Sequence, residues 1–280
     1  MTTAYHQPVQ LEEALRLVAR GATPIAGATA LFSARSLPEG ELVDVTRCGL
    51  GEIRVEEERL VIGATATLSR IGEASDLPGM EGALLRRAAR AAGSRPMRNM
   101  ITLGGNLAHS AFWADMPPAL LALDAEVEVQ RAGEPARLVS IEDCLRPGKR
   151  PWEGGLITAI AVPLAGGIGA WGYERFSRTA NDYALATACV ALRREKKVTR
   201  SVRVVLGALQ NRPYRLSEAE QIFEGKAFGS LMLEQAAAAV RERAQVAPNF
   251  RASEAYRRDL TGTLVRRAVD TALSWALRES

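Results

Sequence analysis

The chain has 280 residues, of which 47% are hydrophobic and 24% charged, a composition typical of a soluble globular protein with two or three compact units. No uninterrupted apolar stretch reaches the length that a bilayer crossing needs, and residues 1–8 lack the basic and then apolar layout of a secretory signal. We therefore expect a cytoplasmic protein.

The net charge of +4 comes from 36 basic and 32 acidic residues. Arginines gather within residues 86–98 and 257–267, but only 5% of the residues are aromatic and no nucleic-acid-binding module is recognisable. We expect these clusters to be solvated helix faces or subunit contacts rather than a surface that binds a polyanion, and we expect no nucleic-acid partner.

The first part of the chain alternates helices and strands. Apolar residues at helical spacing predict a helix over residues 11–18, which Gly21 is placed to end. Short apolar runs predict strands over residues 23–26, 42–45 and 60–64, and a helix follows at residues 70–74. Such alternation favours some parallel strand pairing.

The middle of the chain continues this mixture. An apolar stripe from Leu84 to Ala92 predicts a helix, and Pro117-Pro118 precede a helical turn. Alternating residues predict strands over residues 126–129 and 156–162.

Residues 165–169 are the best linker candidate, because three of these five residues are glycine. Beyond them, strands are predicted over residues 186–192 and 202–209 and a helix over 231–244. A capping box, Ser217 with Glu220, predicts the start of another helix. The last helix begins near Ser253 and is predicted to carry Tyr256, Leu260, Leu264 and Ala268 on one face. This part indicates an antiparallel sheet with helices.

Two glycine-containing segments carry the strongest functional signal. Residues 26–31 read Ala-Gly-Ala-Thr-Ala-Leu, and residues 102–107 read Thr-Leu-Gly-Gly-Asn-Leu. Small residues let backbone N–H groups approach a phosphate, so the pair suggests two loops that hold the pyrophosphate of a dinucleotide. The structural alternatives are a strand-to-helix turn for the first segment and a tight hairpin turn for the second. Ala28 and Ala30 fit the phosphate interpretation only with negative φ, because alanine resists positive φ.

Few other residues offer chemistry. His109 is a lone histidine, and Asp115 could accept hydrogen bonds from a polyol chain or cap the helix that follows. Phe112 and Trp113 are either core anchors or a cover for an aromatic ring system. We expect neither a catalytic group nor a metal site on this chain.

The three cysteines, Cys48, Cys144 and Cys189, are far apart and show no CxxC spacing. This excludes a disulfide framework, and it excludes an iron–sulfur cluster held by this chain alone, because such clusters need four grouped thiolates.

At this point the motifs resemble a known family. The matching segments are residues 98–109 (Arg-Asn-Met-Ile-Thr-Leu-Gly-Gly-Asn-Leu-Ala-His), 115–125, 25–31, 178–184 and 251–258. In this order they resemble the FAD-binding subunit of molybdenum hydroxylases, the family of the medium subunit of carbon monoxide dehydrogenase and the flavin portion of xanthine dehydrogenase. The chain departs from the family at Ala28, where a second glycine is usual, and at Ala30 and Phe112.

The resemblance implies an α+β fold with a two-subdomain FAD-binding domain (PCMH type) over residues 1–165, divided near residue 55. A C-terminal flavoprotein domain of antiparallel sheet plus helices would follow over residues 170–280. Both glycine segments would hold the FAD pyrophosphate, with Asp115 near the ribityl chain and the segment around Asp182 and Tyr183 close to the isoalloxazine. The implied FAD-binding residues are Ala26, Gly27, Ala28, Thr29, Ala30, Leu31, Thr102, Gly104, Gly105, Asn106, His109, Ser110, Asp115, Asp182 and Tyr183.

The resemblance also implies a role and partners. The chain would be an electron-transfer subunit that takes electrons from a small [2Fe-2S] iron–sulfur subunit, beside a large molybdopterin subunit, in a dimer of heterotrimers. FAD would pass these electrons to an external acceptor. The alternatives are a stand-alone flavin oxidoreductase with its own substrate pocket, in which His109 is the plausible point of covalent attachment, and a flavin-free scaffold that docks partner subunits.

Overall fold

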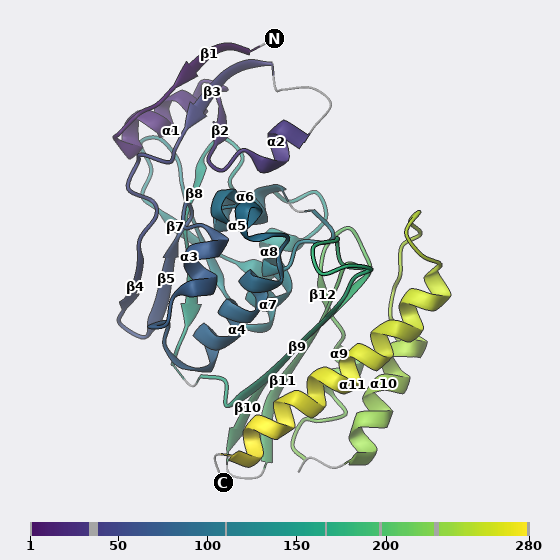
Figure 1. Ribbon diagram of the computed structural model, residues 1–280. Helices are drawn as coiled ribbons and strands as arrows, with labels where there is room; N and C mark the ends of the chain where they lie inside the picture. Colours follow the sequence, from purple (N-terminus) through teal and green to yellow (C-terminus); the bar gives the residue numbers. More distant parts are fainter. Residues whose placement is uncertain are drawn as a thin grey trace.

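Three β-sheets succeed one another along the chain and in space (Figure 1). The computed structural model describes residues 2–33, 39–109, 111–165, 167–195, 198–226 and 230–278. None of the helices in these ranges combines the length and apolarity that a membrane crossing requires. The mixture of sheets and helices confirms the predicted α+β class.

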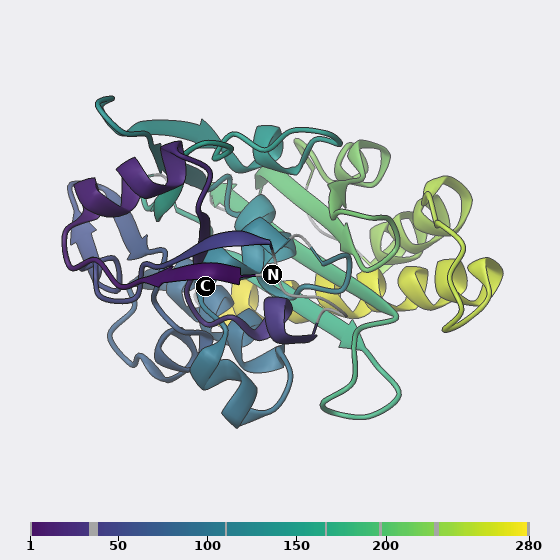
Figure 2. The ribbon, with the colours of Figure 1, turned by 90° about the horizontal axis from the view of Figure 1, so that it is seen from above.

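The N-terminal unit is a three-stranded sheet with strand order β1-β3-β2. Its elements are β1 (Thr2–His6), α1 (Leu11–Ala19), β2 (Thr23–Ile25), α2 (Thr29–Ser33) and β3 (Gly40–Asp44). Strand β3 pairs in parallel with both neighbours, which confirms the predicted parallel pairing. Helix α1 buries Ala14, Leu15 and Val18 against this sheet. Seen from above, the purple strands cross over the middle of the molecule (Figure 2).

The middle unit is a five-stranded antiparallel sheet with strand order β4-β5-β8-β6-β7. Its strands are β4 (Ile53–Glu56), β5 (Arg59–Gly63), β6 (Glu126–Gln130), β7 (Arg137–Ser140) and β8 (Leu156–Pro163). The three predicted strands are β5, β6 and β8. The edge strands β4 and β7 escaped prediction because they are short and carry charged residues, as edge strands commonly do.

Helices cover one face of this sheet (Figure 1). They are α3 (Leu68–Glu73), α4 (Gly79–Ala91), α5 (Arg95–Met100), α6 (Leu103–His109), α7 (Met116–Ala122) and α8 (Ile141–Leu145). Strand residues alternate between the faces, so Leu60 and Ile62 join the helical core while Val61 lies on the other face with Ala159 and Ala161.

The C-terminal unit is a four-stranded antiparallel sheet with strand order β12-β11-β10-β9. Its elements are β9 (Ala170–Phe176), β10 (Ala186–Glu195), β11 (Val198–Gly207), β12 (Tyr214–Arg215), α9 (Ser217–Glu220), α10 (Ser230–Arg243) and α11 (Glu254–Arg278). The antiparallel sheet with helices agrees with the sequence prediction.

The two faces of strand β9 meet different parts of the chain. Trp171 and Tyr173 pack into the core of the middle unit, whereas Ala170 packs against the C-terminal helices. At Gly172 the strand lies against the backbone of Ala268 in α11, which leaves no room for a Cβ atom. Because side chains alternate along a strand, Arg175 also points to the side of the middle unit.

The predicted helix does begin at Ser217, but the capping box assigned to its start was wrong. The N-cap of α9 is Leu216, no side chain caps the helix, and the helix has only four residues. The carboxylate of Glu220 is instead buried, accepts the N–H of Val204 at 3.0 Å and pairs with Arg215 at 2.6 Å. The Glu220 carboxylate, which the local pattern assigned to capping, therefore bonds to the strands instead.

The predicted face of the last helix was also partly wrong. Tyr256 is 49% exposed, and the neighbouring Arg257 is 1% exposed instead. The guanidinium of Arg257 donates to the carbonyl oxygens of Leu185, Ala247 and Ala208. A hydropathy pattern predicts that an arginine is exposed, but here the backbone carbonyl acceptors compensate the buried charge.

Three arginines of the cluster within residues 86–98 bond to backbone carbonyls. Arg86 donates to Ala74 and Leu77, Arg90 to Gly72, and Arg98 to Ala92 and Gly93. These side chains join helix ends and loops within the middle unit.

Candidate functional site

The first glycine segment is the turn between β2 and α2. The α-carbon of Gly27 lies directly against the carbonyl group of Met100, and a Cβ atom there would collide with it. Met100 ends α5, just before the second glycine segment. The two segments, far apart in sequence, are therefore in direct contact, and this contact requires glycine.

Ala28 has a φ of +54°, in the left-handed region. The phosphate interpretation assumed a negative φ here, and the backbone differs from that assumption. Left-handed backbone is unfavourable for alanine by roughly 1–2 kcal/mol. Within the described part of the chain, the N–H groups of Gly27 and Ala28 donate no hydrogen bond. Residues 29–31 begin α2 and are half-buried.

The second glycine segment is the start of helix α6, and so it is neither a loop nor the hairpin turn of the alternative interpretation. The N–H of Leu103 donates to Ala66 O at 2.9 Å, and that of Gly104 to Ala64 O at 2.8 Å. The hydroxyl of Thr102 accepts the N–H of Gly105 at 3.3 Å. The main-chain amides of this segment are therefore largely engaged by the protein itself.

The two glycines of this segment have different surroundings. A Cβ atom on Gly104 would lie 2.8 Å from the Cβ of Ala64, so this glycine permits close packing of α6 on the middle unit. Gly105 is exposed. The side-chain oxygen Oδ1 of Asn106 is buried and has no hydrogen-bond partner among the residues that the structure describes. Buried polar atoms are normally paired, so this amide group points to a ligand.

His109 is exposed in the last turn of α6, and Ser110 lies outside the described residues. Asp115 occupies the N-cap position of α7 but makes no capping bond. Its carboxylate, 6% exposed, instead accepts from Arg175 Nε at 2.8 Å and from the Tyr173 hydroxyl at 3.1 Å. Burial raises the pKa of Asp115 above its ordinary value, although the charge of Arg175 acts in the opposite direction.

Arg175 joins Asp115 to the segment between β9 and β10. Its Nη1 donates to the hydroxyl of Ser177 at 2.7 Å and its Nη2 to the carbonyl oxygen of Asp182 at 2.5 Å. The guanidinium side chain is 8% exposed.

Asp182 and Tyr183 are held from a second side by Arg251. Arg251 Nη2 lies 2.7 Å from Asp182 Oδ1 and 3.0 Å from the carbonyl oxygen of Tyr183. The hydrogen bond from Arg251 lowers the pKa of Asp182 to about 2. The Tyr183 ring is 51% exposed and stacks on Trp113, with centroids 4.3 Å apart.

Sequence reasoning missed Arg175, Tyr173 and Arg251. Arg175 follows Trp171 and Tyr173 at alternate positions of one strand, which is a detectable sign that it shares their buried face. The partner Asp115 is 60 positions away, and no local pattern indicates that pairing.

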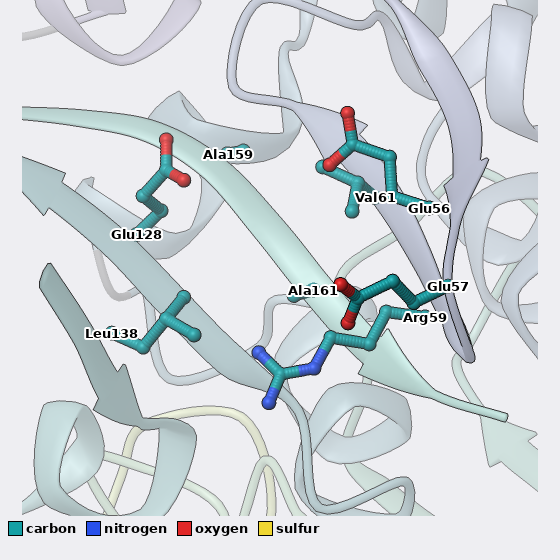
Figure 3. Close-up of a pocket in the computed structure, with 8 residues that line it drawn as sticks. All are labelled: Glu56, Glu57, Arg59, Val61, Glu128, Leu138, Ala159 and Ala161. Atoms are coloured by element: carbon teal, nitrogen blue, oxygen red, sulfur yellow. The ribbon is translucent and has the colours of Figure 1, made fainter. Parts of the chain in front are cut away.

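A hollow lies elsewhere, on the face of the five-stranded sheet that the helices leave uncovered (Figure 3). It has a volume of about 480 Å³, a floor of small apolar residues and a rim that includes Glu56, Glu57 and Glu128. None of the predicted site residues lines it. In the described ranges no three histidine, cysteine or acidic side chains are grouped as a metal site would need.

Comparisons with known proteins cover nearly the whole chain. Residues 1–165 match the family described as the FAD binding domain in molybdopterin dehydrogenase, and residues 171–272 match the CO dehydrogenase flavoprotein C-terminal domain. The carbon monoxide dehydrogenase medium chain of Afipia carboxidovorans is 30% identical over 96% of both chains. The 6-hydroxypseudooxynicotine dehydrogenase complex subunit alpha of Paenarthrobacter nicotinovorans is 32% identical over 94% of this chain and 92% of that one.

The fold agrees with these matches. A chain in the crystal structure of cyanide-inactivated Cu,Mo-CO dehydrogenase superposes with a TM-score of 0.88 at 28% identity, over 98% of this chain and 99% of that chain. Both domains are matched in the same order, from one end to the other. The chain therefore belongs to the FAD-binding medium subunits of the molybdenum hydroxylase family.

Proposed function

We propose that this protein is the FAD-binding electron-transfer subunit of a heteromeric molybdenum hydroxylase. It takes electrons from iron–sulfur clusters on a small partner chain and passes them to an external acceptor, while a large molybdopterin chain oxidises the organic substrate. The observation that carries this proposal is the end-to-end match of both domains to medium chains of such dehydrogenases. We expect the assembly to be a dimer of heterotrimers in the cytoplasm.

Free polar groups at the two glycine segments support FAD as the cofactor. The N–H groups of Gly27 and Ala28 have no acceptor in the described part of the chain, and Asn106 Oδ1 is buried without a partner. The two N–H groups suit phosphate oxygens, whereas the Asn106 oxygen is an acceptor and suits a ribose hydroxyl. Bound FAD supplies the redox chemistry, and the protein supplies binding and orientation.

We assign different roles to the two segments. Gly27 and Ala28 supply backbone donors, because their N–H groups have no acceptor among the described residues. Residues 102–106 supply the Asn106 side chain and the open surface of Gly105, because their amides already bond to Ala64, Ala66 and Thr102. Tyr183, with its exposed ring, is the group proposed to lie near the isoalloxazine.

The need for a partner follows from the cysteines. Cys48, Cys144 and Cys189 are all buried and unpaired. An iron–sulfur cluster needs four grouped thiolates, and this chain has three cysteines that are far apart in sequence. The iron–sulfur clusters must therefore belong to another chain.

The test is to titrate the purified full chain with FAD and to record its absorbance and fluorescence. We expect the two bands of a bound flavin and one FAD per chain, released on denaturation. A protein that binds no FAD would overturn the proposal in favour of a flavin-free scaffold. Flavin that stays attached after denaturation would favour a covalent flavoenzyme, with His109 as the first attachment point to examine.

A further inference from the structure

We propose that Arg175 is a positioning residue that fixes the β9–β10 segment (residues 177–185), and with it Tyr183, against the FAD-binding domain. This inference rests on the proposed function, which puts Tyr183 near the isoalloxazine of FAD. It states that a network of ionic side chains holds Tyr183 in that position. The network consists of Asp115, Tyr173, Arg175, Asp182 and Arg251.

The guanidinium of Arg175 is fully engaged. Its three nitrogens bond to Asp115 Oδ1 at 2.8 Å, Ser177 Oγ at 2.7 Å and the Asp182 carbonyl oxygen at 2.5 Å. Two of these acceptors lie in or next to the β9–β10 segment and the third lies in the FAD-binding domain. The planar fork of arginine holds all three in one fixed geometry, which a lysine ammonium group does not reproduce.

Burial argues that this network has a purpose beyond stability. The Asp115 and Arg175 side chains are 6% and 8% exposed. Removing two charges from water is costly, and apolar residues of similar volume commonly give equal or greater stability. What the ion pair adds is a defined position for the groups it joins.

The positions of Asp182 and Tyr183 follow from this anchor. Arg175 holds the carbonyl of Asp182, and Arg251 holds its carboxylate at 2.7 Å. The same carboxylate accepts the N–H of Tyr183 at 2.8 Å. The exposed Tyr183 ring then stacks on Trp113, two residues before Asp115. The segment is thus fixed at its backbone by Arg175 and at its ring by the FAD-binding domain.

The experiment compares Arg175→Met, Arg175→Lys and Asp115→Asn with the wild-type full chain. The readouts are the Kd for FAD and the rate of trypsin cleavage after Arg178, whose side chain is 61% exposed within the segment. We expect Arg175→Met to weaken FAD binding about tenfold and to speed cleavage. Arg175→Lys should recover part of both effects. Asp115→Asn combined with Arg175→Met should be no worse than Arg175→Met alone, because both act on one network.

Arg215→Met is the matched control. It breaks another ion pair of the C-terminal unit, away from the β9–β10 segment, in which Arg215 (28% exposed) lies 2.6 Å from Glu220 (4% exposed). We expect it to lower the melting temperature while the Kd and the cleavage rate stay unchanged. If Arg175→Met does not fold, Arg175→Lys and Asp115→Asn carry the same comparison.

The outcomes separate the two proposals. Unchanged FAD affinity and cleavage in Arg175→Met, or equal changes in Arg215→Met, would overturn the positioning role. A wild-type chain that takes up no FAD would overturn the proposed function, and the cleavage rates would still decide whether Arg175 fixes the segment.

Discussion

The two glycine segments look alike in sequence but use their backbones in different ways. In residues 26–31 the N–H groups of Gly27 and Ala28 are free within the described ranges, and the turn includes a left-handed alanine. In residues 102–106 the backbone amides donate hydrogen bonds to Ala64, Ala66 and Thr102. In the part of the chain that the structure describes, similar small residues therefore leave backbone N–H donors free in the first segment, whereas in the second segment the N–H groups are used in hydrogen bonds within the fold.

This difference shows that glycine content alone does not identify a phosphate cradle. Gly104 is needed because α6 packs closely on Ala64, which is an architectural reason. The group of this segment that points to a ligand is the Asn106 side chain. Unpaired polar atoms are the better indicator, because a folded chain rarely leaves them buried without a partner.

The largest expected effect comes from the contact between the segments. Gly27→Ala would place a Cβ atom on the Met100 carbonyl, so we expect a loss of about 2–3 kcal/mol in the free energy of unfolding and loss of FAD binding. Denaturant unfolding and FAD titration measure the two effects. Gly169→Ala is the control, because nothing lies within 4 Å of that added Cβ. Equal stability of both variants would show that the two segments do not depend on this contact.

Asn106→Leu tests the second segment alone. Removing a buried polar atom without a partner should leave the free energy of unfolding unchanged or higher. If Asn106 binds FAD, the same change should raise the Kd about tenfold, or about 1.4 kcal/mol. Calorimetric unfolding and fluorescence titration give the pair of values. A fall in stability with unchanged FAD affinity would assign Asn106 to the architecture, like Gly104.

Ala28→Gly tests the strained turn of the first segment. Glycine adopts positive φ without steric cost, so we expect a gain of about 1 kcal/mol in stability and tighter FAD binding. Ala208→Gly is the matched variant, since Ala208 has a φ of +62° and belongs to the C-terminal unit. It should share the gain in stability without changing the Kd for FAD. A change of FAD affinity in both variants would argue against a local role for Ala28.

The smallest expected effect is on the pH dependence of stability. It comes from two ion-paired carboxylates, Asp182 and Asp115, whose pKa values shift in opposite directions. The pKa of Asp182 is lowered to about 2, so its ionised form stabilises the fold above about pH 4, and this contribution is lost as the pH falls toward 2. Burial raises the pKa of Asp115, so protonation of this carboxyl group favours the folded state. Its contribution to the free energy of unfolding is therefore lost as the pH rises through the folded-state pKa.

Melting temperatures measured across the acid range test this difference. Asp182→Asn should flatten the decline at low pH, whereas Asp115→Asn should leave that decline in place. Equal acid profiles for Asp182→Asn and the wild type would show that the bond from Arg251 does not set the behaviour of Asp182.

Much of the fold could be predicted from periodicity. The helical spacing of Ala14, Leu15 and Val18 and the alternation of residues 126–129 reflect burial on one face of the element. Strand β8 is buried along its whole length except its last residue, and its apolar composition is what made it predictable. Predictions based on short polar patterns were less reliable. Ser217 and Glu220 have the spacing of a capping box, but the carboxylate of Glu220 instead bonds to Val204 in β11 and to Arg215 in β12.

The candidate site could be predicted only as a set of segments. The motif around Thr102 and the later segment around Asp182 indicated the family, because their order along the chain is specific. Their hydrogen bonds were not predictable, since the acceptors for Leu103 and Gly104 lie on the distant residues Ala66 and Ala64.

The sequence by itself determined most helices and strands, some parallel pairing in the first part, the antiparallel sheet of the C-terminal unit and the FAD-binding family, because local spacing and motif order are properties of the chain. Only the tertiary structure decided that Gly27 contacts Met100, that Asn106 keeps an unpaired oxygen and that Asp115 pairs with Arg175. Each of these features depends on contacts between residues that are far apart in the sequence. A buried polar group bonds to the partners that the folded structure places beside it, and local sequence does not specify those partners.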